Sequence, residues 1–515
     1  MKNLPIGVSS FRKIREGNYY YVDKTKYVKK LYEEGSYYFI SRPRRFGKSL
    51  FADTLKEAFL CNKGLFKGLY LEDNWNWEDN KSPVILLSFG GGVIADREDL
   101  DRKINFLLHK AAGEYGIEFH FDSVREMFTE LIEGLYSKFN RRVVIIADEY
   151  DKPLLDNITD KKISYEIREG LKNIYSVIKD SDAYVKFAFL AGVSKFSKVS
   201  LFSGLNNLED ITLLEEFSAI CGYTQEDLEI VFKDRLKNFN PEKIKNWYDG
   251  YNFLGESVYN PFDILLLFKQ KKFLNYWFQS ATPNFLINII KEKKYPVADF
   301  EDLKATDNIL SSFDIDIIEL ETILFQTGYL TIKGARELGN TRVFTLSYPN
   351  LEVKMSLTDF ILQYFSNQVS KKDLAKIKLY EIIESNRIDD LKELFHSFFA
   401  SIPNDWYRKN QLSGYEGYYA SIFYCYFTAL GFDVRAEDTT NKGRLDMSVK
   451  FENRVYIFEF KVNQLTKNQG RALLQIKNKK YHEKFVLDFE EIYLIGVEFD
   501  CDERNITCYE WEKYK

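Results

Sequence analysis

Four short apolar runs, separated by longer helical stretches, constrain the fold of the first two hundred residues more than any other feature. The runs are Tyr37–Ser41, Pro83–Phe89, Val143–Ala147 and Val185–Ala191. None of them alternates cleanly between apolar and polar residues, which is typical of strands buried on both faces of a parallel sheet. Helical patterns such as Ser49–Leu60 and Ser123–Phe139 lie between them. This order predicts a doubly wound α/β domain with a ligand site at the carboxyl ends of its strands.

A phosphate-binding loop is predicted directly after the first of these strands. Residues 42–49 read RPRRFGKS, so Gly47, Lys48 and Ser49 take the last three positions of the GxxxxGK[ST] pattern. Such a loop holds phosphates through backbone N–H groups, while its lysine reaches the outer phosphates and its hydroxyl binds magnesium. Arg42 replaces the first glycine, so a basic loop that begins a helix by chance is the competing interpretation. The residues predicted to contact ATP in this loop are Arg45, Phe46, Gly47, Lys48, Ser49 and Leu50.

Two adjacent acids at the end of the third strand support the nucleotide site. Residues 143–150 read VVIIADEY, which places Asp148 to bind magnesium and Glu149 to orient or deprotonate an attacking water. The alternative is a strand capped by two solvated acids. Finding the loop and the acids in order, roughly a hundred residues apart, favours a nucleotide site of the P-loop NTPase kind. After the fourth strand, Ser194 or Lys195 is a candidate sensor of the γ-phosphate.

The length and pattern changes predict several regions. At one domain per roughly 100–200 residues, the 515 residues predict about three domains. Residues 1–215 form the ATPase region and 216–320 a helical lid. Residues 324–354 read as a β-hairpin region after helices, so 321–405 is predicted to be winged-helix-like with a helical connector. Residues 406–515 are predicted to form a C-terminal α/β region.

Composition excludes several classes of protein. The 72 Lys and Arg against 77 Asp and Glu leave a net charge of −5, which excludes a globally basic nucleic-acid coat. The five cysteines form no CxxC pair, which excludes a zinc ribbon or disulfide framework. With four histidines and no HExxH pattern, a metal site has to rest on carboxylates and favours Mg²⁺ or Mn²⁺. No signal pattern or membrane-length apolar run is present, so we expect a cytoplasmic protein without a membrane partner.

A carboxylate-and-lysine site is predicted in the C-terminal region. Residues 443–446 read GRLD, and residues 455–462 read VYIFEFKV after a turn. Because side chains alternate along a strand, Glu459 and Lys461 share a face, and Asp446 on the paired strand can meet them there. The two carboxylates can hold a divalent metal for phosphodiester cleavage, with Lys461 stabilising charge in the transition state. The alternative is a surface hairpin with scattered charge.

Other residues are secondary candidates for the same site. Glu416, which opens the preceding helix, is a further metal ligand, with Glu437 or Asp438 as substitutes. Gln475 and Tyr481, on a helix over the sheet, are candidates to contact the substrate backbone. Basic residues follow closely and are candidates for DNA phosphates, although a charge run is usually a solvated helix face: Lys467, Arg471, Lys477, Lys479 and Lys480.

The chain resembles the AAA-ATPase-like family of bacterial proteins. The resemblance lies in YYVDKTKYVKKL (20–31), SRPRRFGKSL (41–50), ADEYDKP (147–153) and GVSKFSKVSLFSGLNNLEDIT (192–212), and continues through WYDGYNF, VYNP, QTGYLTI and SYPNLEV. Members of this family typically carry a C-terminal PD-(D/E)XK nuclease domain, and the resemblance places its motif on Asp446, Glu459 and Lys461. It therefore implies a restriction-endonuclease-like α/β domain, nuclease-like in function, over residues 406–515. It also implies that an arginine at position 42 is normal. Asp23 and Lys24 belong to the family pattern, as a structural turn or as a contact to base or phosphate.

The residues and the resemblance together lead to one leading function and two alternatives. The leading expectation is an ATP-regulated, Mg²⁺-dependent (or Mn²⁺-dependent) nuclease acting on nucleic acid, foremost DNA. The alternatives are a nucleotide-gated oligomerising signalling switch and a nucleic-acid-binding module with an inactive nuclease fold. Self-association stays open, because an arginine finger can come from Arg44, Arg45 or a neighbouring copy of the chain.

Overall fold

The computed structural model describes residues 2–195, 205, 207–278, 297–311, 319–366, 369–402, 416–440, 442–463 and 470–515, without the side chains of residues 298, 308, 311, 364–366, 369–371, 416 and 463. Contacts divide the chain into an N-terminal unit, Met1–Ala281 with Lys304–Asn350, and a C-terminal unit, Thr282–Leu303 with Leu351–Lys515. The domain boundaries predicted above stay predictions. Among the described residues, no helix is long and apolar enough to cross a membrane.

The N-terminal unit is built on a five-stranded parallel sheet. Its strand order is β2-β3-β4-β1-β5, and every pairing is parallel. The strands are β1 (Tyr37–Ser41), β2 (Val84–Ser88), β3 (Val143–Asp148), β4 (Val185–Gly192) and β5 (Glu209–Asp210). All six residues of β3 are buried, as expected for a strand covered on both faces. The predicted strands and the doubly wound class are confirmed.

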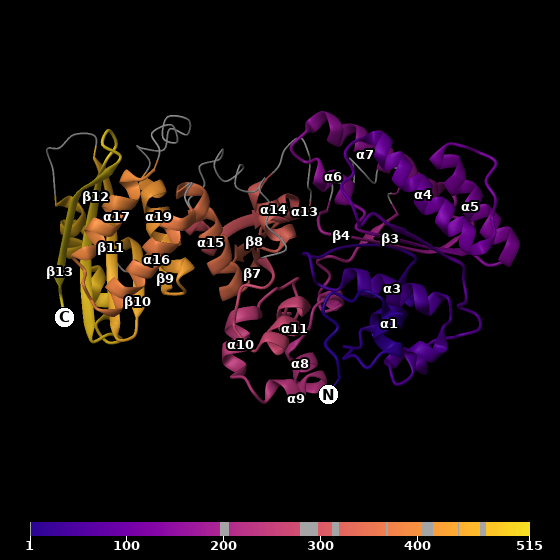
Figure 1. Cartoon of the computed structure of the whole chain (residues 1–515), viewed down its shortest axis with the longest axis horizontal. Helices are drawn as coiled ribbons and strands as arrows, with labels where there is room; N and C mark the ends of the chain where they lie inside the picture. The colour runs from indigo at the N-terminus through magenta and orange to yellow at the C-terminus, as the bar shows by residue number, and fades with distance from the viewer. Residues whose placement is uncertain are drawn as a thin grey trace. The chain divides into compact units, whose positions relative to one another are not determined.

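Helices cover both faces of this sheet. Figure 1 shows α1 and α3 on one side of the sheet and α4 to α7 on the other. Helix α3 begins one residue before the predicted stretch, and α5 one residue after its predicted start. The helices are α1 (Phe11–Glu16), α2 (Thr25–Glu34), α3 (Lys48–Phe59), α4 (Arg97–Tyr115), α5 (Val124–Phe139), α6 (Lys152–Asp156) and α7 (Lys161–Asp180).

A helical segment and a small winged sheet complete the N-terminal unit. The helices are α8 (Gln225–Val231), α9 (Lys233–Leu236), α10 (Pro241–Tyr248), α11 (Pro261–Gln270), α13 (Asp307–Ser311) and α14 (Leu320–Thr327). Helices α8, α10 and α11 share one apolar cluster with Tyr20 and Val22 of the N-terminal segment. Strands β6 (Leu303–Thr306), β7 (Thr331–Leu338) and β8 (Thr341–Ser347) pair in the order β6-β8-β7.

One part of the predicted hairpin region is helical. Residues 324–327 (LFQT), which we expected in the hairpin, form the last turn of α14. The helix ends because Gly328 adopts a left-handed conformation, with φ of 90°, that glycine reaches without steric cost. Strand β7 therefore starts at Thr331, and the hairpin is shorter than predicted at its first strand.

The C-terminal unit has a five-stranded mixed sheet. Its order is β13-β12-β11-β10-β9, in which only the β11–β12 pairing is parallel. The strands are β9 (Asp433–Thr440), β10 (Gly443–Phe451), β11 (Arg454–Asn463), β12 (Glu491–Asp500) and β13 (Asn505–Lys513). The sequence predicts strands at the β-like runs 444–451, 454–462 and 491–498, and these are the three central strands. The two edge strands were not predicted from the sequence. Strand β9 has many exposed, polar residues, so a search for continuous apolar runs does not find it.

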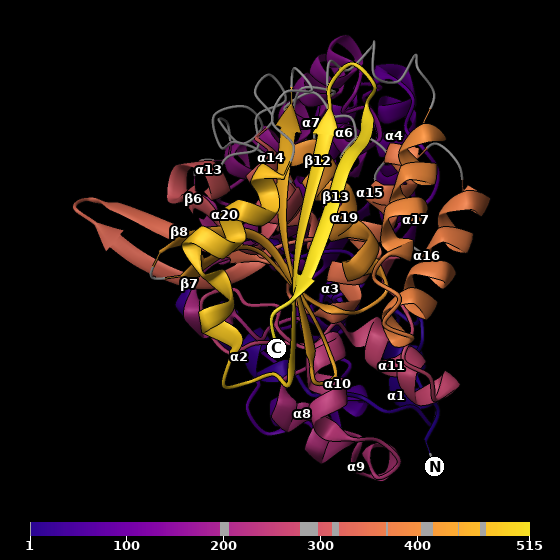
Figure 2. The same cartoon turned by 90° about the vertical axis from the view of Figure 1, so that its left-hand side faces the viewer.

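Two layers of helices cover this sheet on opposite faces (Figure 2). Helix α19 (Glu416–Ala429) packs on β9, β10 and β11, and α20 (Arg471–Lys479) on β11 and β12. On β11, Phe458 and Phe460 face Phe423 of α19, whereas Val455 and Ile457 join the apolar cluster under α20. By alternation, Glu459 and Lys461 lie on the α20 face. The remaining helices are α15 (Leu351–Ser366), α16 (Val369–Glu384) and α17 (Asp390–Ala400).

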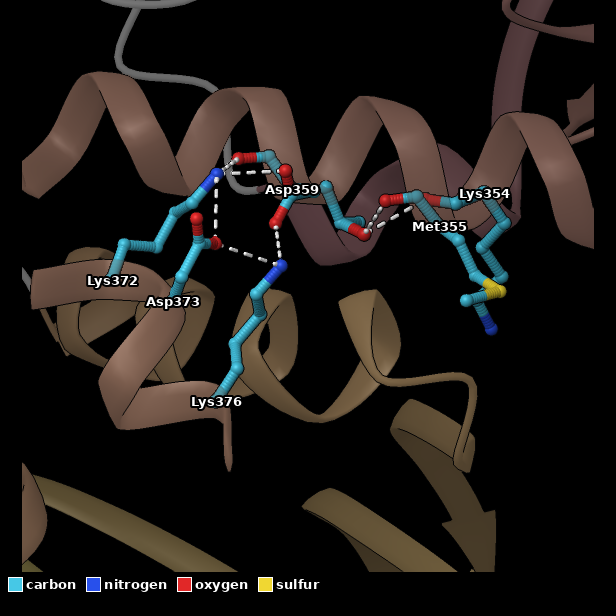
Figure 3. Close-up of polar contacts among 7 residues, drawn as sticks. Lys354, Met355, Asp359, Lys372, Asp373 and Lys376 are labelled. Atoms are coloured by element: carbon cyan, nitrogen blue, oxygen red, sulfur yellow. Dashed lines mark hydrogen bonds and ion pairs between the residues drawn. The ribbon is translucent and has the colours of Figure 1, made fainter. Parts of the chain in front are cut away.

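An ion-pair network with one buried lysine joins α15 to α16 (Figure 3). Both carboxylate oxygens of Asp359 are used: Oδ2 lies 2.7 Å from Nζ of Lys372, and Oδ1 lies 2.6 Å from Nζ of Lys376. Asp373 adds a second carboxylate, 3.3 Å from Lys376. Because the Lys372 side chain is only 3 % exposed, its charge depends on these partners. The network therefore fixes the register between two helices of the C-terminal unit.

Candidate functional site

The predicted phosphate loop connects β1 to α3 at the carboxyl edge of the parallel sheet. Gly47 is the residue before the helix and has a left-handed φ of 92°. The buried ammonium of Lys48 donates to the carbonyl oxygens of Arg42 and Pro43 at 2.8 and 2.9 Å. Burial lowers the pKa of Lys48, and the nearby carboxylates of Asp151, Asp148 and Glu149 oppose that shift. The backbone carbonyls of the loop therefore hold the Lys48 ammonium in place.

Arg42, at the position of the missing glycine, supports the loop from the protein interior, and we call its contacts the Arg42 bracket. Its guanidinium donates to the carbonyls of Ser41 (2.9 Å), Thr212 (2.8 Å) and Phe217 (3.1 Å). It also stacks on Phe253, with Cζ 3.9 Å from the ring centroid. Burial lowers the pKa of Arg42 to about 10, so it stays charged at neutral pH. The side chain points into the protein and holds the loop from behind.

Among the other predicted loop residues, one packs in the core and the rest are exposed or half-buried. The Phe46 side chain is buried against Tyr251, at 4.8 Å between ring centroids. Its backbone carbonyl accepts a hydrogen bond from Gly222 N at 3.1 Å. The exposed guanidinium of Arg45 lies over the Phe262 ring at 4.8 Å. The side chain of Phe46 is therefore part of the core, while the half-buried Ser49 and Leu50 follow on the helix.

A mainly apolar pocket borders the loop at Gly47 and Leu50. Its other lining residues include Tyr20, Tyr21, Val22, Lys24, Cys221 and Tyr223. Asp23, next to this wall, accepts hydrogen bonds from Thr25 N and Tyr70 N at 2.8 and 2.7 Å. Lys24 pairs with Asp227 at 2.6 Å. The family pattern at positions 23 and 24 therefore makes structural ties that shape one wall of the pocket.

The predicted acids lie where the sequence places them, at the end of β3. Asp148 is 7 % exposed, and its Oδ1 is buried and accepts no hydrogen bond from the described part of the chain. Glu149 has a left-handed φ of 54°, a strained value for a residue other than glycine. Burial, and then the charge of Asp148, raise the pKa of Glu149. Such a carboxylate is a better proton acceptor than a solvated one.

Asp151 is a site residue that the sequence analysis missed. It is 1 % exposed, and its Oδ2 accepts from Val193 N (2.9 Å), Ser194 N (2.6 Å) and Ser194 Oγ (2.6 Å). Ser194 thus has its hydroxyl held at the end of β4. The signal was present in the sequence as the third acid of DEYD, three residues after Asp148. Lys195 forms an ion pair with Asp210, and its N–H donates to Gln326 at 2.9 Å.

The structure brings Asp446, Glu459 and Lys461 together on the C-terminal sheet. Met447 pairs with Phe458, so Asp446 and Glu459 are the next opposed positions on β10 and β11. Asp446 Oδ2 accepts from the N–H of Phe460 at 2.7 Å. Glu459 is fully buried, and its Oε1 accepts from Nζ of Lys461 at 3.2 Å. Two carboxylates and a lysine therefore meet on one face.

Helix α20 contributes Gln475 to this group. The side-chain amide of Gln475 donates to Oε1 of Glu459, so it contacts the predicted metal ligand itself. The helix lies very close to β12, because a Cβ at Gly496 would stand 2.4 Å from the backbone N of Leu473. Tyr481, after the helix, donates to the carbonyl of Arg444 at 2.9 Å and fixes the start of β10. Both residues thus position the site in this structure.

The remaining predicted residues have other surroundings. The Glu416 side chain and Lys467 lie outside the described residues. Glu437 pairs with Arg444 at 2.7 Å, and Asp438 pairs with Lys484. Arg471, Lys477, Lys479 and Lys480 are exposed. Lys477 pairs with Glu512 at 2.7 Å and Lys480 with Glu483 at 3.8 Å, so part of the predicted basic tract is neutralised.

Comparisons with known proteins match two parts of the chain to known families. Residues 5–202 match the family described as predicted AAA-ATPase, and residues 414–509 match the PD-(D/E)XK nuclease superfamily. The "uncharacterized protein in vnfD 5'region" of Azotobacter chroococcum mcd 1 is 50% identical over 507 residues, 98% of both chains. The chain belongs to the AAA-ATPase-like family with a C-terminal PD-(D/E)XK nuclease superfamily domain. The resemblance read from the sequence is confirmed.

The residues present fit the cofactors that this family implies. At the ATPase site, the buried Oδ1 of Asp148 and the hydroxyl of Ser49 are hard oxygen donors of the kind that Mg²⁺ prefers. At the nuclease site, Asp446 and Glu459 offer two carboxylates on adjacent strands, again a set suited to Mg²⁺ or Mn²⁺. No softer ligand stands beside Asp446 or Glu459 in the contacts described above.

Placing the glycine of the GxxxxGK[ST] pattern at position 42 should lower the stability of the protein and its affinity for ATP. We expect Arg42→Gly to lower the free energy of unfolding by more than about 3 kcal/mol, because three buried carbonyls lose a charged donor and a cavity is left. ATP affinity should fall as well, since the bracket behind the loop is lost. Thermal unfolding and nucleotide titration measure the two effects. Arg44→Ala, at an exposed neighbour, is the matched control, and an Arg42→Gly variant as stable as this control would contradict the bracket.

Removing the amide of Gln475 should weaken metal binding. We expect Gln475→Ala to lower Mn²⁺ affinity roughly 10- to 100-fold, because partners that orient a ligand carboxylate typically have effects of that size. Calorimetric titration without nucleotide measures the affinity. Asn478→Ala, on the exposed side of the same helix, should behave as wild type. Equal affinities in Gln475→Ala and wild type would show that the amide does not hold Glu459.

Proposed function

We propose that this protein binds and hydrolyses ATP and that its C-terminal domain is a metal-dependent nuclease acting on DNA, with nucleotide state controlling the nuclease. The observation that supports this most directly is the Asp446, Glu459 and Lys461 group on a chain that also carries Lys48 and Asp148 at a sheet edge. Each group contains the charges that its reaction needs. Buried acids beside a lysine at a sheet edge or on a sheet face are typical of functional sites.

At the ATPase site, each residue has a proposed part. Gly47 and the N-terminus of α3 would hold phosphate oxygens through backbone N–H groups. Lys48 would exchange its two loop carbonyls for the outer phosphates, and Ser49 with Asp148 would hold Mg²⁺. Glu149 would accept a proton from the attacking water. The apolar pocket beside Gly47, lined by Tyr21 and Tyr223, suits the base of the nucleotide.

At the nuclease site, Asp446 and Glu459 would hold the metal and Lys461 would lie beside the scissile phosphate. A divalent metal in this position supplies charge to polarise the phosphodiester and to acidify water. Lys461 would offset negative charge that develops in the transition state. Gln475 would keep the Glu459 carboxylate in one orientation. Mg²⁺ is the proposed physiological ion, and Mn²⁺ has the same preference for oxygen ligands.

The proposed control by nucleotide rests on contacts inside the N-terminal unit, between the phosphate loop and the segment from α14 to β8, which we call the winged segment. A Cβ at Gly328, between α14 and β7, would stand 2.7 Å from Cβ of Pro43, so the backbone of Gly328 lies directly against the proline ring. Gln326 accepts from the N–H of Lys195, next to Ser194 at the end of β4. Because Pro43 also accepts from Lys48, release of that lysine towards phosphates would act directly on the winged segment.

A cleavage assay tests the nuclease and its control together. Purified protein is mixed with linear, circular and single-stranded DNA and with RNA, in Mg²⁺ or Mn²⁺, with and without ATP. We expect DNA cleavage that Asp446→Ala and Lys461→Ala abolish, because they remove a metal ligand and the transition-state charge. Lys48→Ala should remove the response to ATP and leave the nuclease residues intact.

The controls separate the possible outcomes of this assay. Cleavage that survives Asp446→Ala would come from a contaminant and would contradict the nuclease assignment. DNA binding that Lys461→Ala leaves unchanged, in a protein without cleavage, would indicate an inactive nuclease fold. ATP binding with slow hydrolysis, together with an increase in particle mass, would indicate an oligomerising switch. Equal cleavage by wild type and Lys48→Ala at every ATP concentration would contradict the nucleotide control.

The ATPase rate should depend on pH through Glu149. A base works in its deprotonated form, and the pKa of Glu149 is raised by burial and by Asp148. The rate should therefore be highest at high pH. As the pH decreases, it should fall before the pH reaches the ordinary pKa of glutamate, about 4.3. Glu149→Gln should retain ATP binding and lose hydrolysis. ATP binding measured at each pH is the control, and a constant rate down to that range would contradict Glu149 as the base.

A further inference from the structure

The hairpin β7–β8 is exposed on both of its faces. Every residue from Lys333 to Arg342 is exposed, including both sides of β7 and the two-residue turn at Gly339 and Asn340. Figure 2 shows the hairpin as a long two-stranded ribbon. A strand that only completes a core buries alternate residues, as Phe344 and Leu346 do at the base of β8. The outer half of this ribbon therefore has no packing function within the described structure.

The exposed part of the ribbon carries cations on both faces. Arg336 is paired across the strands with Val343, and Arg342 with Glu337, so the two arginines lie on opposite faces. Neither guanidinium forms an ion pair or hydrogen bond within the described residues, and Arg342 lies over the Phe344 ring at 5.3 Å. The segment from 333 to 343 contains Lys333, Arg336 and Arg342 against one acid, Glu337. The ribbon is thus basic in a chain of net charge −5.

Several cations of the C-terminal unit, among the residues that the structure describes, already have carboxylate partners. Lys442 pairs with Glu483 at 3.0 Å and Lys477 with Glu512 at 2.7 Å. Arg444 pairs with Glu437, and Lys484 with Asp438. An exposed cation that already has a carboxylate partner loses part of the gain from neutralising a phosphate. A further basic region on the same chain would therefore add to the affinity for nucleic acid.

We propose that the β7–β8 hairpin binds the major groove of duplex DNA, with Arg336 and Arg342 contacting the phosphates on its two walls. This inference rests on the proposed nuclease function. A β-ribbon with its side chains is about 10 Å thick, which fits the major groove of B-DNA, about 12 Å wide, and not the minor groove of about 6 Å. Cations on both faces match the phosphate backbones on both sides of the groove. Leu338, 51 % exposed beside the turn, would contact base edges.

The same geometry distinguishes duplex DNA from other nucleic acids. The major groove of A-form RNA is too deep and narrow for side chains to enter, so an RNA duplex should bind less tightly. Single strands are held mainly by stacking on exposed aromatic side chains. The exposed part of the hairpin, residues 333–342, contains no aromatic residue. Duplex DNA is therefore the nucleic acid that this ribbon fits.

Binding without cleavage tests the proposal. Full-length protein carrying Asp446→Ala is titrated, without divalent metal, into a fluorescent DNA duplex over a series of salt concentrations, and anisotropy gives the affinity. Adding Arg336→Ala and Arg342→Ala should raise Kd roughly 10- to 100-fold near about 0.1 M salt. It should also reduce the slope of log Kd against log salt by about 1.8, the value for two lost phosphate contacts. Arg336→Lys with Arg342→Lys should retain the slope.

The controls keep the failure of this proposal separate from a failure of the nuclease. Arg102→Ala with Arg125→Ala removes two exposed, ion-paired arginines of α4 and α5 and should leave Kd and the slope unchanged. An unchanged slope in the hairpin variant, or tighter binding of duplex RNA or single-stranded DNA, would overturn the proposal even if wild type cleaves DNA. Conversely, hairpin-dependent binding by a protein that never cleaves would support it without the nuclease.

Discussion

The buried guanidinium of Arg42 joins three parts of the N-terminal unit that are far apart in the sequence. Its donors are shared among the carbonyls of Ser41, Thr212 and Phe217, and its face rests on Phe253. A buried cation is stable only when such partners compensate for the water it has lost. Any arrangement that moves the phosphate loop away from Thr212 or Phe253 would expose this charge to an apolar interior. The contacts of Arg42 therefore fix the loop on the side that faces the protein interior, and the opposite side is left for a ligand.

The two sites use one physical arrangement in different sheets. In each, a buried acid at a strand lies near a lysine: Asp148 is near Lys48, and Glu459 accepts from Lys461. In each, another side chain fixes a member of the group, since Asp151, directly before α6, holds Ser194, and Gln475 of α20 holds Glu459. The acids and the lysine of each group oppose one another's charge, an arrangement suited to a site for a metal or a phosphate.

The sequence predicted what depends on local pattern and missed what depends on distant contacts. The four buried strands, the turn at Gly47 and the shared face of Glu459 and Lys461 all follow from periodicity, and the structure has them. The bracketing by Arg42 requires a carbonyl 170 residues away, and the contact of Lys195 with Gln326 spans 131 residues. No local pattern carries such information. The edge strands β9 and β13 were missed because partly exposed strands lack a continuous apolar run.

The proposed DNA-binding hairpin and the proposed nuclease site would place binding and chemistry on different parts of this chain. The lysines around the carboxylate site largely have acidic partners, whereas Arg336 and Arg342 have none in the described structure. A region that binds DNA on the same chain raises the local concentration of substrate for a site that binds it weakly. Such a region can also be regulated without altering a metal ligand. Because β7 starts three residues after Gly328, which touches Pro43 of the phosphate loop, nucleotide binding would act on DNA binding before it acts on cleavage.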